Sequence, residues 1–135
     1  MFEQVLAKYP TEVKLVFKNF PLTSIHKDAM NAGAAALAAH AQGKFWEYHD
    51  KLFAEKRLTD EALVEYARQL GLNLDKFNHD RKSREIQQAV AEDGRDGMQA
   101  GVRGTPTIFI NGRRLKQRSL EGFAEIIEEQ LAKKK

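Results

Sequence analysis

The 135-residue sequence contains no cysteine. This absence excludes a disulfide framework, a thiolate metal site and any thiol nucleophile within these residues. It leaves the compartment open, because a protein without cysteine suits a reducing or an oxidising environment. No cofactor or metal site is predicted either, since no two of the four histidines form an i, i+4 pair; these are His26, His40, His49 and His79.

The sequence also lacks a long apolar run and a concentrated basic stripe. Its longest alanine-rich stretch, residues 32–41, is too short to span a membrane. The 22 basic and 19 acidic residues are interleaved and give a net charge of +3, and the terminal Lys133–Lys135 reads as a solvated tail. We therefore predict no nucleic-acid partner and no membrane span. No signal-peptide pattern follows Met1.

The composition is that of one soluble globular domain over residues 1–135, with 42% apolar and 30% charged residues. Hydrophobic periodicity predicts helices separated by few strands. The expected strands are Val13–Phe20, closed by Pro21, and a pair at residues 106–110 and 113–116. The expected helices are 1–9, about 24–42 (from Ser24), 44–56, 59–70, a short one around Phe77, 83–100 and one that follows Ser119.

Local signals mark several element boundaries. Thr59, Ser83 and Ser119 are expected to cap helices, and Asn73 or Asp75 to start the short helix around Phe77, because their side-chain oxygens can accept bonds from free helical N–H groups. Asn111-Gly112 predicts a tight hairpin, since both central residues of a type I′ turn need positive φ.

Two side-chain clusters have an ordinary structural interpretation. We expect the aromatic residues Phe45, Trp46, Tyr48 and Phe53 to form helix core rather than line a ligand site. The carboxylates Glu92, Asp93 and Asp96 are typical of a solvated helix face rather than of a catalytic pair. Neither cluster therefore indicates catalysis.

Thr105-Pro106 stands at the start of an apolar strand-like run, and its interpretation from the residues alone is structural. Proline is tolerated as the first residue of a strand, where its missing N–H does no harm. A trans bond is the ordinary expectation, since only about 5% of X-Pro bonds in folded proteins are cis.

Three stretches together carry a resemblance to a known family. VRGTPTIFINGRRL (102–115) resembles the cis-proline segment of the DsbA-like family of thioredoxin-fold thiol-disulfide oxidoreductases. VKLVFKNFPL (13–22) and HKDAMNAGAAALAAHAQGKFWEYHDKLF (26–53) resemble the same family's second strand and helical insertion. The similarity runs over essentially the whole chain and agrees with the predicted order of elements.

The resemblance implies an α/β, thioredoxin-like (DsbA-type) fold with a helical insertion at residues 24–87. It implies a cis Thr105-Pro106 bond, and it makes Thr105 and Pro106 the residues that contact an extended protein or peptide substrate. The sequence departs from the family because the Cys-x-x-Cys motif, which would precede the helix at residues 1–9, is absent, as is the central strand before it. We therefore expect an N-terminally truncated domain without catalytic residues of its own.

Two hypotheses of function follow. In the first, the chain is the C-terminal portion of a thiol-disulfide oxidoreductase and is redox-inactive by itself. In the second, it is a non-catalytic module that binds a peptide or a second copy of itself through the strand edges left open beside the missing strand. A homodimer or a swapped dimer is expected to cover those edges. The family is commonly exported in bacteria, which implies a periplasmic or extracytoplasmic location for a full-length member.

Overall fold

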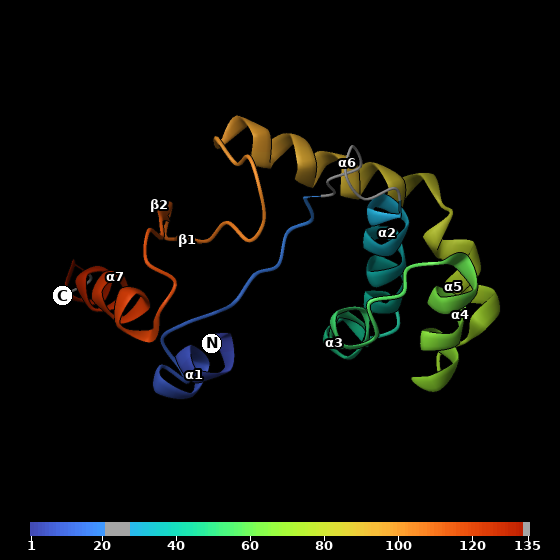
Figure 1. The fold of residues 1–135 in the computed structure, drawn as a ribbon, viewed down its shortest axis with the longest axis horizontal. Coiled ribbons are helices and arrows are strands. Elements are labelled where there is room, and N and C mark those ends of the chain that lie inside the picture. Colours follow the sequence, from blue (N-terminus) through green and yellow to red (C-terminus); the bar gives the residue numbers. More distant parts are fainter. Residues whose placement is uncertain (21–27, 134–135) are drawn as a thin grey trace. The chain divides into compact units, whose positions relative to one another are not determined.

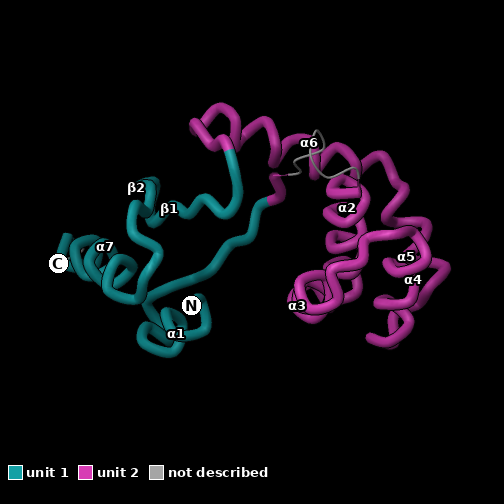
Figure 2. The backbone as a smooth tube through the Cα atoms, viewed as in Figure 1, with its two compact units in different colours: residues 1–18, 104–135 teal, residues 19–103 magenta. Residues whose placement is uncertain are grey.

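A computed structural model of the chain describes residues 1–20 and 28–133. Predictions for Pro21, for a helix start at Ser24, for His26 and for Lys134 and Lys135 lie outside the described residues. The chain divides into two compact units: unit 1 comprises residues 1–18 and 104–135, and unit 2 comprises residues 19–103 (Figure 2). Each unit is described by itself.

In the described residues of unit 2, all of the regular structure is helical (Figure 1). Its helices are α2 (Ala29–His40), α3 (Phe45–Glu55), α4 (Asp60–Gln69), α5 (Leu74–Arg81) and α6 (Arg84–Gln99). The helical insertion expected at residues 24–87 falls within this unit. α6 continues beyond it, to Gln99.

Three of the expected helix caps are confirmed in unit 2. The side-chain oxygen of Thr59 accepts a hydrogen bond from the Ala62 N–H at 3.2 Å. Asn73 accepts one from the Lys76 N–H at 3.0 Å, and this selects Asn73 over Asp75 as the residue that caps α5. Ser83 caps α6 in the same way. Each cap satisfies one of the N–H groups that have no partner inside the helix.

The core of unit 2 forms around α2, whose alanines let neighbouring helices approach closely. Ala35, Ala38 and Ala39 are fully buried, and the other helices place large side chains against α2. The largest fully buried side chains are those of Tyr48, Phe77, Leu63 and Val90. The Tyr48 hydroxyl donates to the Leu63 carbonyl oxygen at 2.8 Å, so this buried polar group is satisfied.

A buried arginine joins α4 and α5. The Arg81 side chain is only 7% exposed, and its guanidinium donates to both carboxylate oxygens of Asp60, at 2.7 and 3.2 Å. Its Nε donates to Asn78 at 2.9 Å. The bonds from Arg81 lower the pKa of Asp60, chiefly because they favour the ionised carboxylate.

Unit 1 consists of α1 (Phe2–Lys8), β1 (Phe109–Ile110), β2 (Arg113–Arg114) and α7 (Leu120–Lys133). The strands pair antiparallel, Phe109 with Arg114 and Ile110 with Arg113. Asn111 and Gly112 have φ of 49° and 82°, as a type I′ turn requires. The expected cap of α7 is confirmed, because the Ser119 hydroxyl accepts from the Gly122 N–H at 3.0 Å.

The core of unit 1 is small. Its buried members are Val5, Tyr9, Leu115, Phe123 and Ile127, contributed by the N-terminal segment, the hairpin and α7. The Tyr9 hydroxyl donates to the Glu128 carboxylate at 2.8 Å. Burial, followed by that bond, raises the pKa of the Tyr9 phenol.

The predicted strand Val13–Phe20 is wrong for this structure, because none of these residues belongs to a strand. Within the described ranges, the one strand pairing is β1 with β2. The alternating pattern is present in the sequence, but a strand also requires a partner strand, and in the described ranges no strand pairing includes residues 13–20. The pair expected at 106–110 and 113–116 is confirmed in place and shortened to two residues each.

Two further expectations need correction in unit 2. Tyr48 is core and Phe45 packs against it, but Trp46 is 41% exposed and Phe53 is 65% exposed, so the expectation is wrong for these two residues of the cluster. Asp93 is half-buried rather than solvated, and it accepts a hydrogen bond from the backbone N–H of Asn19 at 2.9 Å. Helical spacing alone does not show which side chains a neighbouring segment covers.

Candidate functional site

The segment that enters β1 carries the residues predicted to bind substrate. The Thr105-Pro106 peptide bond is cis, the form that the resemblance implies. Thr105 and Pro106 are both exposed. The Thr107 hydroxyl donates to the Gly104 carbonyl oxygen at 2.7 Å and holds the segment in a local turn.

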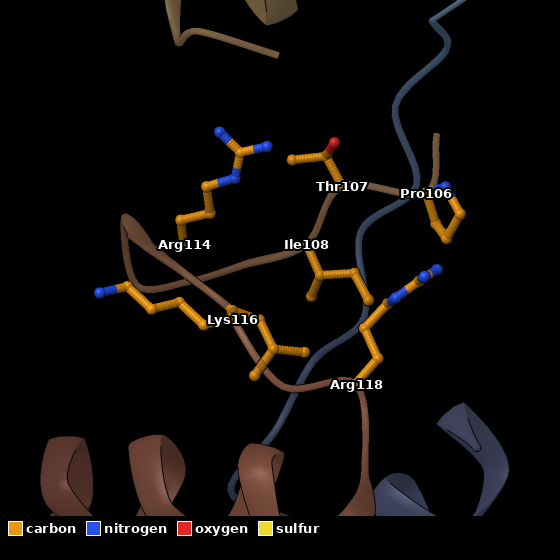
Figure 3. Close-up of a pocket in the computed structure, with 7 residues that line it drawn as sticks. Pro106, Thr107, Ile108, Arg114, Lys116 and Arg118 are labelled. Carbon is orange, nitrogen blue, oxygen red and sulfur yellow. The ribbon is translucent and has the colours of Figure 1, made fainter. Parts of the chain in front are cut away.

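A pocket of about 320 Å³ opens beside Pro106 (Figure 3). It is lined by Pro106, Thr107, Ile108, Arg114, Leu115, Lys116 and Arg118. Leu115 is buried, whereas the three cationic residues are exposed. The pocket therefore combines an apolar part with a cationic rim, and none of its lining residues is acidic.

The hairpin separates two neighbouring arginines because successive side chains on a strand point to opposite faces. Arg113 shares a face with the core residue Leu115 and forms an ion pair with Glu129 on α7. This ion pair lowers the pKa of Glu129. Arg114 points to the other face, and in Figure 3 its side chain extends on the same side as that of Thr107.

The cations of the pocket have no acidic partner in the part of the chain that the structure describes. No ion pair there includes Arg114, Lys116 or Arg118. In Figure 3 the guanidinium of Arg118 extends toward Pro106, whereas Lys116 points away from it. Arg114 and Arg118 are thus the two groups best placed to meet an anion in this pocket.

The opposite edge of β1 is open. The Leu115 N–H donates to the Ile108 carbonyl oxygen at 2.8 Å, and Ile110 faces Arg113 across the turn. The antiparallel pattern alternates, so the peptide groups of Thr107 and Phe109 point away from β2. Among residues 1–20 and 28–133, no backbone hydrogen bond is made by Thr105 or Thr107.

An apolar groove of about 200 Å³ lies along this open edge, entirely within unit 1. One wall is β1 and the other is the extended segment around Val13–Leu15, while α1 and α7 contribute further apolar side chains. The apolar lining residues are Phe2, Val5, Leu6, Val13, Leu15, Ile108, Phe109, Ile110, Phe123, Ile127 and Leu131. The groove is thus flanked by two backbone segments, and among the described residues neither segment is paired on the side that faces the groove.

The sequence identified Thr105 and Pro106 but missed the cations beside them. Of the two predicted residues, only Pro106 lines the pocket. Arg114 and Lys116 could have been found from the strand's alternation, which places both on the face opposite to Leu115. Arg118 lies beyond the strand, and no periodic signal brings it to Pro106.

Two other kinds of feature are absent from the described ranges. In residues 1–20 and 28–133, no group of three potential ligands is arranged to hold a metal ion. No helix in that part of the chain has the length and apolar composition needed to cross a bilayer.

The chain is similar to segments of several curated proteins. It is 41% identical over 112 residues to "Na(+)/H(+) antiporter NhaA 3" of Salinispora tropica, a match that covers 82% of this chain and 17% of that protein. It is 31% identical over 116 residues to "Na(+)/H(+) antiporter NhaA" of Herminiimonas arsenicoxydans, covering 85% of this chain and 18% of that protein. The chain thus spans about one sixth of the length of these relatives.

A family match covers nearly the whole chain. The model of the family described as "DSBA-like thioredoxin domain" matches residues 1–128, a range that includes all of the described secondary structure except the end of α7. Both walls of the open groove and all seven residues of the pocket fall inside it. The chain therefore belongs to the DSBA-like thioredoxin domain family.

Proposed function

We propose that this chain is the C-terminal, substrate-binding portion of a DsbA-like protein thiol-disulfide oxidoreductase. The observation that carries the proposal is the open edge of β1, with the unpaired peptide groups of Thr105 and Thr107 beside the exposed Pro106. Such an edge can add an extended peptide as a further strand, with main-chain hydrogen bonds providing affinity. Thr105 and Pro106 would contact that peptide.

The reactive cysteines would come from outside the 135 residues. Thiol-disulfide exchange requires a thiolate nucleophile, and this sequence has no cysteine. The apolar groove offers a place for a further strand between β1 and residues 13–15. A segment that fills it would complete the sheet and could bring a Cys-x-x-Cys motif close to Pro106. The relatives support a longer functional unit, since each is about six times the length of the matched segment.

The test begins with the coding DNA upstream of the Met1 codon, translated in frame. The proposal expects an apolar, strand-like run followed by Cys-x-x-Cys. The longer product should reduce insulin with dithiothreitol as electron donor, and the 135-residue chain should not. Insulin reduction by the purified short chain would contradict the proposal. A stop codon with no preceding Cys-x-x-Cys would also contradict it.

The second candidate function is a non-catalytic module that binds a peptide or associates with itself. The groove favours it, because two copies could cover their apolar walls and pair their open edges. Sedimentation equilibrium tests whether the chain associates with itself, and a dimer is expected. The dimer should dissociate when Phe109→Lys places a charge in the groove. A monomer at all concentrations would exclude this form of the module.

A further inference from the structure

The cationic pocket beside Pro106 has no role in peptide pairing along the open edge of β1. Its three basic residues line about 320 Å³ of open space, and no acidic residue lines it. Among the described residues, this concentration of unpaired positive charge lies on one face of the hairpin, because Arg113 on the other face is paired with Glu129. The chain thus pairs one arginine of the Arg113-Arg114 dipeptide and leaves the other at the pocket.

We propose that the pocket selects acidic peptides, whose glutamate or aspartate carboxylates are bound by Arg114 on one side of β1 and by Arg118 on the other. This inference rests on the proposed function, because it names the chemical class of peptide that the edge beside Pro106 receives. A guanidinium presents its donors in a planar fork that matches a carboxylate. The two arginines approach the pocket from β2 and from the loop before α7.

The geometry favours a peptide over a nucleic acid. Extended peptides carry side chains on alternating sides, so a peptide held by the edge at Thr105–Thr107 projects every second side chain to one face. Thr107 belongs both to that edge and to the pocket lining, so a carboxylate on that face would lie near Arg114. Nucleic-acid recognition would call for a longer basic track, and in the described part of unit 1 the next strand residue, Arg113, is already paired.

The test compares two fluorescent nine-residue peptides by anisotropy. One alternates valine with threonine, and the other replaces one threonine and one neighbouring valine by glutamate, so that each face carries one carboxylate. The acidic peptide should bind about fivefold more tightly for each arginine that it meets, at low salt. The ratio of the two Kd values should fall toward one in 0.5 M salt, because exposed charge pairs are screened.

Matched variants assign the effect to the pocket. Arg114→Gln and Arg118→Gln should each lower the Kd ratio about fivefold, and the double variant should bring it close to one. Arg113→Gln removes the same charge from the neighbouring position and should preserve the ratio, because that arginine lies on the opposite face. Far-UV circular dichroism checks that all four proteins are folded.

The outcomes separate the two proposals. If neither peptide binds, both this inference and the peptide-binding function are overturned. If both bind with equal Kd, or if Arg113→Gln lowers the ratio as much as Arg114→Gln, the acidic preference is overturned and peptide binding stands. If a 12-nucleotide single strand or inorganic phosphate displaces the acidic peptide at equal concentration, the site is a general anion site and the peptide assignment is overturned.

Discussion

The two units of this chain differ in how completely they bury their apolar side chains and hydrogen-bond their polar groups. Unit 2 buries a continuous core around α2, and the buried cation Arg81 has hydrogen-bond partners on two sides. Unit 1 has a small core, a two-residue pair of strands and an apolar groove with open backbone along it. All of the candidate binding features lie in unit 1. The comparison teaches that the candidate recognition features lie where packing is incomplete.

The largest expected effect is a cavity in unit 2. Phe77 is fully buried and contacts the Tyr48 ring at 5.6 Å between centroids. Phe77→Ala should lower the free energy of unfolding of unit 2 by about 3–5 kcal/mol, since both the apolar transfer energy and packing contacts are lost. Urea denaturation followed by fluorescence of Trp46, the sole tryptophan, reports this unit selectively.

The matched control for that change is Phe53→Ala. Phe53 is 65% exposed on α3, so the same substitution there should cost less than about 1 kcal/mol. Hydrogen exchange extends the comparison to unit 1. If α7 loses amide protection at the same denaturant concentration as unit 2, the two units unfold as one. That result would contradict a difference in stability between the units.

A second substitution is directed at unit 1. A Cβ added at Gly122 would lie 2.1 Å from the backbone oxygen of Gln117, and the backbone cannot move aside without breaking the start of α7. Gly122→Ala should therefore destabilise unit 1 by about 1–3 kcal/mol, read as faster amide exchange in α7. Gly104→Ala is the control, because nothing lies within 4 Å of a Cβ there. Equal effects of the two changes would contradict the close contact.

Acid should weaken unit 2 through Asp60. The folded-state pKa of Asp60 is lowered, so its bonds to Arg81 stabilise the fold above the unfolded pKa of about 3.9 and are lost as pH falls below it. Asp60→Asn should be less stable than the parent at pH 7, and the difference should shrink between pH 5 and pH 3. Thermal melts across this range measure it. Asp75→Asn, in the first turn of α5, is the control.

The smallest effect is expected at Arg113–Glu129. Both side chains are about half exposed, at 46% and 47%, so solvent screens the pair. Glu129→Gln should leave the unfolding midpoint unchanged within error, although the arginine loses its partner. A clear destabilisation in a urea titration would show that this pair, rather than the apolar packing of Leu115 and Phe123, holds the hairpin on α7.

These contrasts explain which features the sequence could predict. Thr59, Ser83 and Ser119 were identified correctly because a cap depends on residues only three positions apart. The turn at Asn111-Gly112 is local in the same way. Residues 13–20 were predicted wrongly as a strand, because strand formation depends on a partner that no local pattern specifies.

The candidate site was predictable only in part, for the same reason. Thr105 and Pro106 were found through the resemblance, since composition and spacing alone gave an ordinary strand-edge proline. The cations around the pocket depend on tertiary placement: Arg118 reaches Pro106 only because the loop before α7 returns beneath the hairpin. The exposure of Trp46 likewise depends on what packs against α3, which periodicity does not show.

The dipeptide Arg113-Arg114 determines how the hairpin responds to a one-residue shift in the alignment of its strands. If the strands slipped by one residue, each face would still present an arginine, one toward Glu129 and one toward the pocket. The charges therefore do not choose between the two alignments. Leu115 does, because a slip would move this 7%-exposed side chain into solvent and bring Lys116 against α7. The turn at Asn111-Gly112 and the apolar side chain of Leu115 thus favour the observed alignment, while the arrangement of charge is redundant.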